Sequence, residues 1–289
     1  MNTSDLIINF TPTGMIPTKD LTPFSAISPA EIINDVRLAW DIGITMVHLH
    51  ARDIDSGKPS CDASIFKEII LGIREFAPEL IICATTSGRM HGKFEDRAAA
   101  LYLQGEAKPD MASLTLSSVN FNKRASVNEP DMIKSLAQEM KNLGIKPELE
   151  AFDAGMINYA RYLIAKGIIE PPYYFNLILG NIACAQADPL HAGVMIRDLP
   201  AESYWSLGGI GNHQLRMNAM SIAIGGGVRV GLEDNIWFDV ARTEMASNSS
   251  LLQRVHKLAK LQDRGLMSSV TLRERLNLSV KKGFYGVAT

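Results

Sequence analysis

Short apolar runs alternate with longer amphipathic segments along nearly the whole chain. Eight of the apolar runs have the length and composition of β-strands, and most are continuously apolar rather than alternating. Strands of this kind are typical of a parallel sheet that is covered on both faces. The predicted strands span residues 6–11, 45–51, 80–85, 111–116, 146–151, 173–179, 202–206 and 228–231.

The segments between these strands carry the period of amphipathic helices. At the start of the first helix, Ser28 precedes Pro29, and Glu31 follows three residues after the serine, as in a capping box. Gly43 and Gly144 follow helical patterns at positions where a C-terminal cap is expected. The predicted helices span 29–42, 62–76, 94–104, 131–142, 154–166, 212–225 and 239–263, with a weaker pattern over 188–198.

The repetition of strand and helix predicts the fold class. Eight such units in roughly 250 residues fit an α/β fold of the (β/α)8 TIM-barrel type better than a doubly wound sheet. No G-x-G-x-x-G motif follows the first strand, which argues against a dinucleotide-binding Rossmann fold. Because no Pro/Ser-rich or charged linker divides the chain, we expect a single barrel domain over 1–289 with a helical extension from about residue 264.

Composition narrows the class of protein. The 289 residues are 46% hydrophobic, enough for a sizeable core, and the net charge of -2 provides no basic field for nucleic acid. The first residues lack the pattern of a signal peptide, and no apolar run approaches the ~20 residues that span a bilayer. We therefore expect a cytoplasmic protein with a small-molecule substrate and neither a membrane nor a nucleic-acid partner.

Two histidines one residue apart end the second predicted strand. Residues i and i+2 of a strand point to the same face, so His48 and His50 can both reach one metal ion. Barrel enzymes build their sites at the C-terminal ends of the strands, where Glu233 follows the eighth strand. Two histidines and a carboxylate leave open positions on a divalent ion, and we favour zinc over iron. A hydrogen-bonded histidine pair and a solvated acidic loop are the alternatives.

Other strand ends carry further polar side chains. Arg229 can point into the barrel mouth, either to clamp a substrate carboxylate or to pair with Asp234. Glu148 and Glu150 lie on one face of the fifth strand. Carboxylates that face a barrel interior need cations or hydrogen bonds, so we expect at least one of the two to be functional. Hydroxyl groups after the third and fourth strands suit an oxyanion or a carboxylate.

In combination, these motifs resemble the β-keto acid cleavage enzymes, the family that includes 3-keto-5-aminohexanoate cleavage enzyme. The resemblance covers nearly the whole chain, and the histidine and Gly-Leu-Glu-Asp motifs together are specific. It is carried by Thr13-Gly14, VHLHARD at 47–53, the Thr-Thr-Ser-Gly turn at 85–88, MASLTLSSVNF at 111–121, PELEAFDAGM at 147–156, Gly209-Ile210-Gly211 and GGGVRVGLEDN at 225–235.

The resemblance implies a fold, a metal and a reaction. It implies a (β/α)8 barrel that binds Zn2+ through His48, His50 and Glu233, and a homotetramer. It also implies that a β-keto acid condenses with acetyl-CoA and that the adduct splits into acetoacetate and a new acyl-CoA. This is an acyl transfer with cleavage of a carbon–carbon bond, in which zinc would act as a Lewis acid on the keto acid.

The same match implies roles for individual residues. Asp234, paired with Arg229, would activate the substrate, and Glu150 would assist in the polar network. The remaining expected contacts are with the substrate, at Thr85, Gly88, Ser113, Thr115 and Ile16.

The chain departs from the family pattern at two places. Where the aminohexanoate-cleaving member has an acidic residue, this chain has Ile16, which removes a partner for a substrate ammonium group. We therefore expect a keto acid with an uncharged or apolar tail. In the turn that is usually Ser-Thr-Gly-Gly, Thr85 keeps the first hydroxyl, but Ser87 replaces a glycine, so the match defines the turn geometry less well.

Two other functions compete with this interpretation. One is a divalent-metal aldolase or hydrolase on the same barrel that needs no CoA. The other is a ligand-binding barrel with a structural or empty metal site, although a structural zinc normally has four protein ligands and only three are apparent. No CoA-binding motif is recognisable, so acetyl-CoA rests on the resemblance alone.

Overall fold

Eight parallel strands close into a barrel in the computed structural model, which describes residues 5–288. The last barrel strand pairs with the first, so the sheet has no free edge. The predicted (β/α)8 TIM barrel is confirmed, with a strand in each predicted region. The barrel strands are β2 (Ile8–Phe10), β3 (Met46–Leu49), β6 (Ile81–Ala84), β7 (Met111–Thr115), β10 (Lys146–Ala151), β11 (Tyr173–Leu179), β12 (Ser203–Gly209) and β13 (Gly227–Val230).

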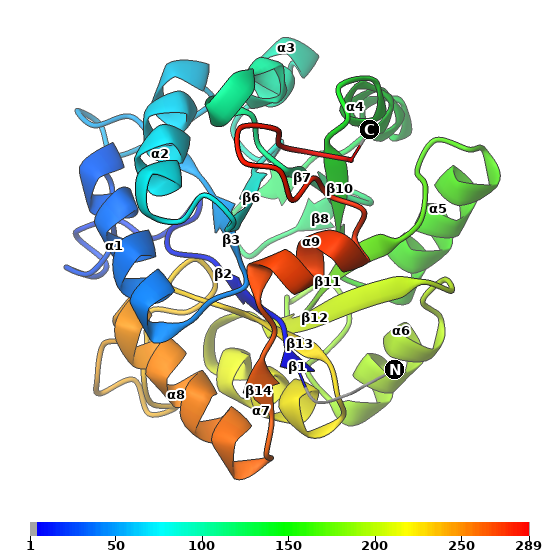
Figure 1. The fold of residues 1–289 in the computed structure, drawn as a ribbon. Coiled ribbons are helices and arrows are strands. Elements are labelled where there is room, and N and C mark those ends of the chain that lie inside the picture. The colour runs from blue at the N-terminus through cyan, green and yellow to red at the C-terminus, as the bar shows by residue number, and fades with distance from the viewer. Residues whose placement is uncertain (1–4, 289) are drawn as a thin grey trace.

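Helices surround the barrel (Figure 1). The predicted capping box is present: Ser28 accepts a hydrogen bond from the Glu31 backbone, and the Glu31 side chain accepts one from the Ser28 backbone. The surrounding helices are α1 (Pro29–Ile42), α2 (Ala63–Phe76), α3 (Phe94–Ala98), α4 (Pro130–Asn142), α5 (Ala154–Ala165), α6 (Pro189–Arg197), α7 (Gln214–Ala223) and α8 (Asn248–Leu261).

Two predicted helices differ in extent from the observed ones. The helix predicted over 239–263 begins only at Asn248, because Asp239 accepts hydrogen bonds from the backbones of Thr243 and Glu244 and holds a turn there. Ser247 then caps α8. The helix predicted over 94–104 ends at Ala98 and continues as a short 3-10 helix.

Two hairpins extend from the C-terminal ends of the barrel strands. One is formed by β4 (Ala51–Arg52) and β5 (Pro59–Ser60), the other by β8 (Val119–Asn120) and β9 (Ala125–Ser126). The buried guanidinium of Arg52 donates to the carbonyl groups of Gly14 and Gly57. This contact holds the loop after β2 against the barrel mouth. A Cβ atom at Gly14 would overlap the side chain of Glu233, so glycine is required where this loop meets the site.

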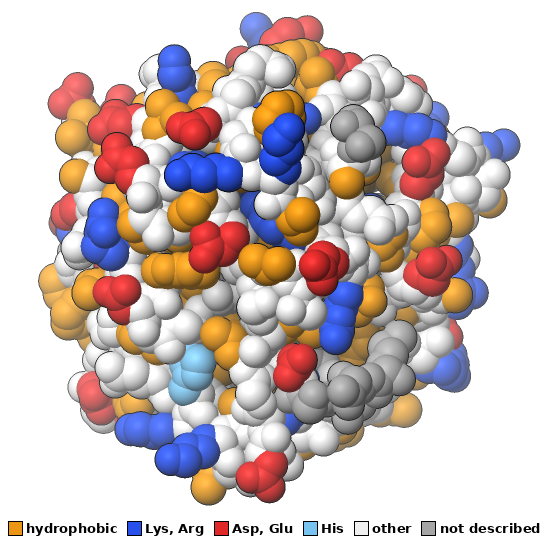
Figure 2. All heavy atoms as spheres, in the orientation of Figure 1, with side chains coloured by type: hydrophobic (Ala, Val, Ile, Leu, Met, Phe, Trp, Pro, Cys, Tyr) orange, Lys and Arg blue, Asp and Glu red, His pale blue; other side chains and the backbone are white. Residues whose placement is uncertain are grey.

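The N-terminal end of the barrel is covered by α9 (Ser269–Arg275), which lies across the ring of strands in Figure 1. Leu272 and Leu276 pack there against Met46, Ile81 and Met111, which belong to barrel strands. Chain segments β1 (Asp5–Leu6) and β14 (Gly265–Leu266) pair beside α9. Figure 2 shows that charges of both signs are interspersed on this face. None of the helices over 5–288 combines the length and apolarity that a bilayer crossing requires.

Candidate active site

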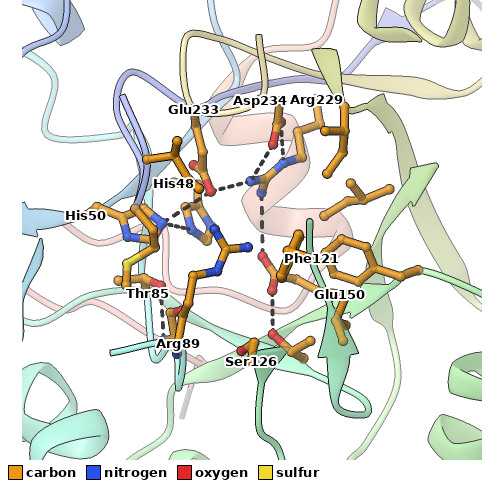
Figure 3. A pocket seen from close by; sticks show the side chains of 18 residues that line it. His48, His50, Thr85, Arg89, Phe121, Ser126, Glu150, Arg229, Glu233 and Asp234 are labelled. Carbon is orange, nitrogen blue, oxygen red and sulfur yellow. Dashed lines mark hydrogen bonds and ion pairs between the residues drawn. The ribbon is translucent and has the colours of Figure 1, made fainter. Parts of the chain in front are cut away.

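A pocket of about 210 Å³ lies at the C-terminal ends of the barrel strands (Figure 3). Its walls contain most of the residues that the sequence analysis selected. Those residues are Ile16, His48, His50, Thr85, Thr115, Glu150, Arg229, Glu233 and Asp234. Gly88 and Ser113 are not among the lining residues. The fold therefore brings together side chains that are up to 218 positions apart in the sequence, from Ile16 to Asp234.

His48, His50 and Glu233 form a candidate metal centre. The Nε2 atoms of the two histidines are 3.2 Å apart, and Nε2 of His50 is also 3.2 Å from Oε1 of Glu233. Two nitrogen ligands of a tetrahedral zinc lie roughly 3.4 Å apart, given bonds of about 2.0–2.1 Å. Oε2 of Glu233 is buried and has no hydrogen-bond partner among the described residues. The donor types and their spacing therefore fit a divalent ion.

Glu148 of β10 orients His48 from inside the barrel, behind the residues that line the pocket. Its Oε2 lies 2.5 Å from Nδ1 of His48, while its Oε1 accepts a hydrogen bond from Asn9 at 2.7 Å. A proton held on Nδ1 leaves Nε2 free to face the pocket, as is usual for metal-ligating histidines. Burial lowers the pKa of His48, but the charges of Glu148 and Glu233 outweigh it and raise this pKa to about 9, so a metal ion that binds Nε2 has to displace a proton from it. The alternation on β10 indicated an inward Glu148, yet its contact with His48 could not be predicted from spacing.

Arg229 connects the metal centre to two further carboxylates. Its guanidinium group lies 2.7 Å from Glu233, 2.9 Å from Asp234 and 3.6 Å from Glu150, measured between the nearest nitrogen and oxygen atoms. Thr115 donates a hydrogen bond of 2.7 Å to the other oxygen of Glu150. The structure thus places Arg229 beside Asp234, one of the two alternatives left open by the sequence.

The acid–base properties of this network differ from those of exposed carboxylates. Burial raises the pKa of Asp234 even though Arg229 counteracts it, and Glu233 raises the pKa further. Burial likewise raises the pKa of Glu150 against the effect of Arg229. A carboxylate with a raised pKa is a better proton acceptor near neutral pH. The network can therefore remove a proton from a bound substrate.

One wall of the pocket is apolar, which the sequence analysis missed. Phe121 and Phe152 pack edge to face with ring centroids 5.8 Å apart. Ile16 is 55% exposed at the pocket opening. The apolar residues come from the β8–β9 hairpin and from the C-terminal ends of β10, β11 and β12, so no local pattern groups them. The wall consists of Val119, Phe121, Phe152, Ile178 and Ile210.

Gly88 instead lies in the turn after β6, and Ser113 of β7 contacts that turn. The hydroxyl of buried Ser113 accepts a hydrogen bond from the Thr86 backbone, and Thr86 donates one to the Ser113 carbonyl. A Cβ atom at Gly88 would lie 2.6 Å from a guanidinium nitrogen of Arg97 and 2.9 Å from the Val127 carbonyl. The next residue, Arg89, does line the pocket, although the sequence analysis gave it no role.

The closed barrel and the possible metal ligands at its C-terminal end define the class of protein. It is a TIM-barrel protein with a candidate metal centre beside an acid–base network. A sequence model of the beta-keto acid cleavage enzymes matches residues 5–278, and the chain belongs to this family. The predicted family is confirmed, and the chain is an enzyme, as predicted.

Relatives of known name are similar over nearly their whole length. A 3-keto-5-aminohexanoate cleavage enzyme from Acetoanaerobium sticklandii is 34% identical over 95% of this chain and 98% of its own. A 3-oxoadipate:acetyl-CoA acetyltransferase from Cupriavidus necator is 36% identical over 96% of each chain. Among solved structures, a complex of ObcA with oxaloacetate has a TM-score of 0.79 at 19% identity, over 89% of this chain and 68% of ObcA. The last similarity shows a shared fold.

Proposed function

We propose that this protein condenses a β-keto acid with acetyl-CoA and releases acetoacetate and a new acyl-CoA. The observation that carries the proposal is the joint placement, in one pocket of a family member, of the metal donors and the Arg229–Asp234 pair. The name of the Cupriavidus necator relative supports acetyl-CoA as the second substrate. The reaction is an acyl transfer in which a carbon–carbon bond breaks.

His48, His50 and Glu233 would hold a divalent ion, which we propose to be zinc. When bound, the ion supplies Lewis acidity toward the oxygens of the keto acid. The contact between Glu148 and His48 fixes the orientation of one donor ring.

In this proposal, Asp234 is the general base. It accepts a proton from the carbon between the ketone and the carboxylate, and this carbon then attacks the thioester carbonyl of acetyl-CoA, releasing the CoA thiolate. The thiolate attacks the ketone carbonyl of the original acid, and the bond from that carbonyl to the central carbon breaks. The acetoacetate carbanion takes the proton back from Asp234, so atoms and charge balance.

Arg229 and the hydroxyl groups position the reacting groups. Arg229 orients Asp234 through the 2.9 Å contact, and Glu150 faces the same guanidinium from the other side. Thr85, Thr115 and Ile16 are proposed substrate contacts because they line the pocket. The homotetramer that the resemblance implies and the cytoplasmic location expected from the sequence also belong to the proposal. Light scattering of the purified protein measures the subunit number.

The direct test is an assay of zinc-loaded protein with a panel of β-keto acids, with and without acetyl-CoA, followed by mass spectrometry of the products. The proposal predicts acetoacetate and a new acyl-CoA in equal amounts, formed only when acetyl-CoA is present. Cleavage at the same rate without acetyl-CoA would favour the aldolase or hydrolase alternative. The Asp234→Asn variant provides the matched inactive control.

A further inference from the structure

Arg89 places a cation in the pocket that has no anionic partner there. Its side chain lines the pocket, and Figure 3 shows it entering beside Thr85 and extending toward the middle of the site. Over residues 5–288, its guanidinium group makes no hydrogen bond or ion pair within the protein. A half-buried guanidinium without an acceptor is unfavourable unless a ligand supplies one.

The other polar groups of the pocket are already engaged. Arg229 makes the direct contacts with the three lining carboxylates Glu150, Glu233 and Asp234, and none of them forms an ion pair with Arg89. The Thr115 hydroxyl donates to Glu150. Arg89 is therefore free to bind an anion that enters from outside.

Phe121 fixes where the guanidinium lies. The Cζ atom of Arg89 is 3.5 Å from the centroid of the Phe121 ring, the geometry of a cation–π contact. Stacking uses the flat face of the guanidinium and leaves its N–H edge available, and that edge matches a carboxylate through two parallel hydrogen bonds. The arrangement is thus preorganised for a planar anion.

Two observations indicate which anion binds. Arg89 lines the same pocket as His48, Glu233 and Asp234, so its guanidinium shares one cavity with the proposed reacting centre. The phosphates of CoA are separated from its thioester by a long arm, so they are poorly placed to reach the same position. Beyond Arg89, the pocket continues along the apolar wall of Val119, Phe121, Phe152, Ile178 and Ile210.

We propose that Arg89 binds the carboxylate of the β-keto acid and that the apolar wall receives an apolar tail. The substrate class is then a monocarboxylic β-keto acid with a hydrocarbon chain. The naming of the ligand as a β-keto acid rests on the proposed function. The apolar tail agrees with the expectation drawn from Ile16. It is inferred here from contacts between pocket residues that the sequence did not reveal.

The test is calorimetric binding of freshly prepared 3-oxohexanoate to zinc-loaded protein in the absence of acetyl-CoA. We expect Arg89→Gln to weaken this binding roughly 10- to 100-fold, because a charge-assisted hydrogen-bond pair is lost. Arg89→Lys should recover only part of the affinity, since a lysine cannot form the planar pair. The affinity for acetyl-CoA should not change. Arg124→Gln, an exposed arginine on the neighbouring hairpin, is the matched control and should bind 3-oxohexanoate like the wild type.

Three results would overturn the proposal. The first is equal affinity of Arg89→Gln and wild type for 3-oxohexanoate. The second is a loss of acetyl-CoA affinity instead, which would make Arg89 a phosphate contact. The third is a wild-type preference for 3-oxoadipate that Arg89→Gln abolishes, since Arg89 would then bind a carboxylate on the tail. Because binding is measured without turnover, a failed acetyl-CoA-dependent reaction contradicts only the proposed function.

Discussion

The two ends of the barrel bury charged side chains in opposite ways. At the N-terminal end, Asp110 is fully buried, and each of its oxygens accepts several hydrogen bonds from donors that include Arg74, Arg273 and the backbone of Ile82. Arg273 comes from α9, so this cluster attaches the helix to the barrel. The carboxylate there is completely satisfied by the protein.

At the C-terminal end, the charges are left incompletely paired. One guanidinium, that of Arg229, faces three carboxylates, and an oxygen of Glu233 is buried without a hydrogen bond among the described residues. A native structure retains such groups where a ligand completes them, since an unsatisfied buried group costs stability. Buried charge at one end is matched within the fold, whereas at the other end it is left incompletely paired where the proposed function places a metal and a substrate.

The largest expected effect is on activity, from a change at the C-terminal end. Asp234→Asn removes the proposed base and should lower kcat by about 10²- to 10⁴-fold. The midpoint of thermal unfolding should change little, because Arg229 keeps its contacts with Glu233 and Glu150. Steady-state kinetics measures kcat, and calorimetry measures the midpoint of thermal unfolding. A variant with more than a tenth of the wild-type kcat would contradict the role of Asp234.

The matching change at the N-terminal end should have the reverse outcome. Asp110→Asn leaves Arg74 and Arg273 buried without their anion, and we expect a loss of about 3–5 kcal/mol in the free energy of unfolding. Per folded molecule, kcat should match the wild type. Urea titration measures the loss. Asp198→Asn, which removes an exposed pair with Arg197, is the control and should unfold at nearly the same urea concentration as the wild type.

Acidic pH should reduce the difference in stability between wild type and Asp110→Asn. Burial acts to raise the pKa of Asp110, but Arg74 and Arg273 outweigh it, so the folded-state pKa lies below the ordinary value. Its contribution to stability is therefore present above about pH 4 and is lost as the pH falls through the folded-state pKa. The gap between the unfolding midpoints of the two proteins, compared between pH 3 and pH 7, should narrow toward the acidic end. A constant gap would show that the Asp110 charge is not the stabilising element.

The smallest effect is expected at Ser113, which the resemblance assigns to the substrate but which lies behind the pocket. Ser113→Ala removes a hydrogen bond to the Thr86 backbone, worth about 1 kcal/mol of stability. The KM for the keto acid should stay within a factor of about three, since Ser113 does not line the pocket. A tenfold rise in KM without a change in stability would restore Ser113 as a substrate contact.

The fold was predictable because its signals are local. Continuously apolar strands and capped helices repeat along the chain, and each can be recognised within a window of about 11–18 residues. The late start of α8 could not be predicted. The turn before it depends on the Asp239 side chain as a hydrogen-bond acceptor, which a helical period does not reveal. Strand register also predicted that His48 and His50 share a face, which follows from the two-residue period alone.

The rest of the site depends on distances across the barrel. Glu148 contacts His48 although 100 positions separate them, and no spacing rule connects the two. The position of Arg89, in the loop after β6, depends on its stacking on Phe121 of the β8–β9 hairpin. Ser113 matches a family position, but its hydroxyl accepts a hydrogen bond from the Thr86 backbone and it does not line the pocket, so its contact with the substrate stays a prediction.

Metal content tests the contrast between the two ends most directly. Elemental analysis after purification and dialysis should find one zinc per chain in the wild type and in Asp110→Asn, and almost none in Glu233→Ala. Glu233→Ala should fold, because the residue lies in the incompletely paired cluster. Unchanged metal content in folded Glu233→Ala, or zinc absent from the wild type after loading, would contradict the claim that His48, His50 and Glu233 form the metal centre.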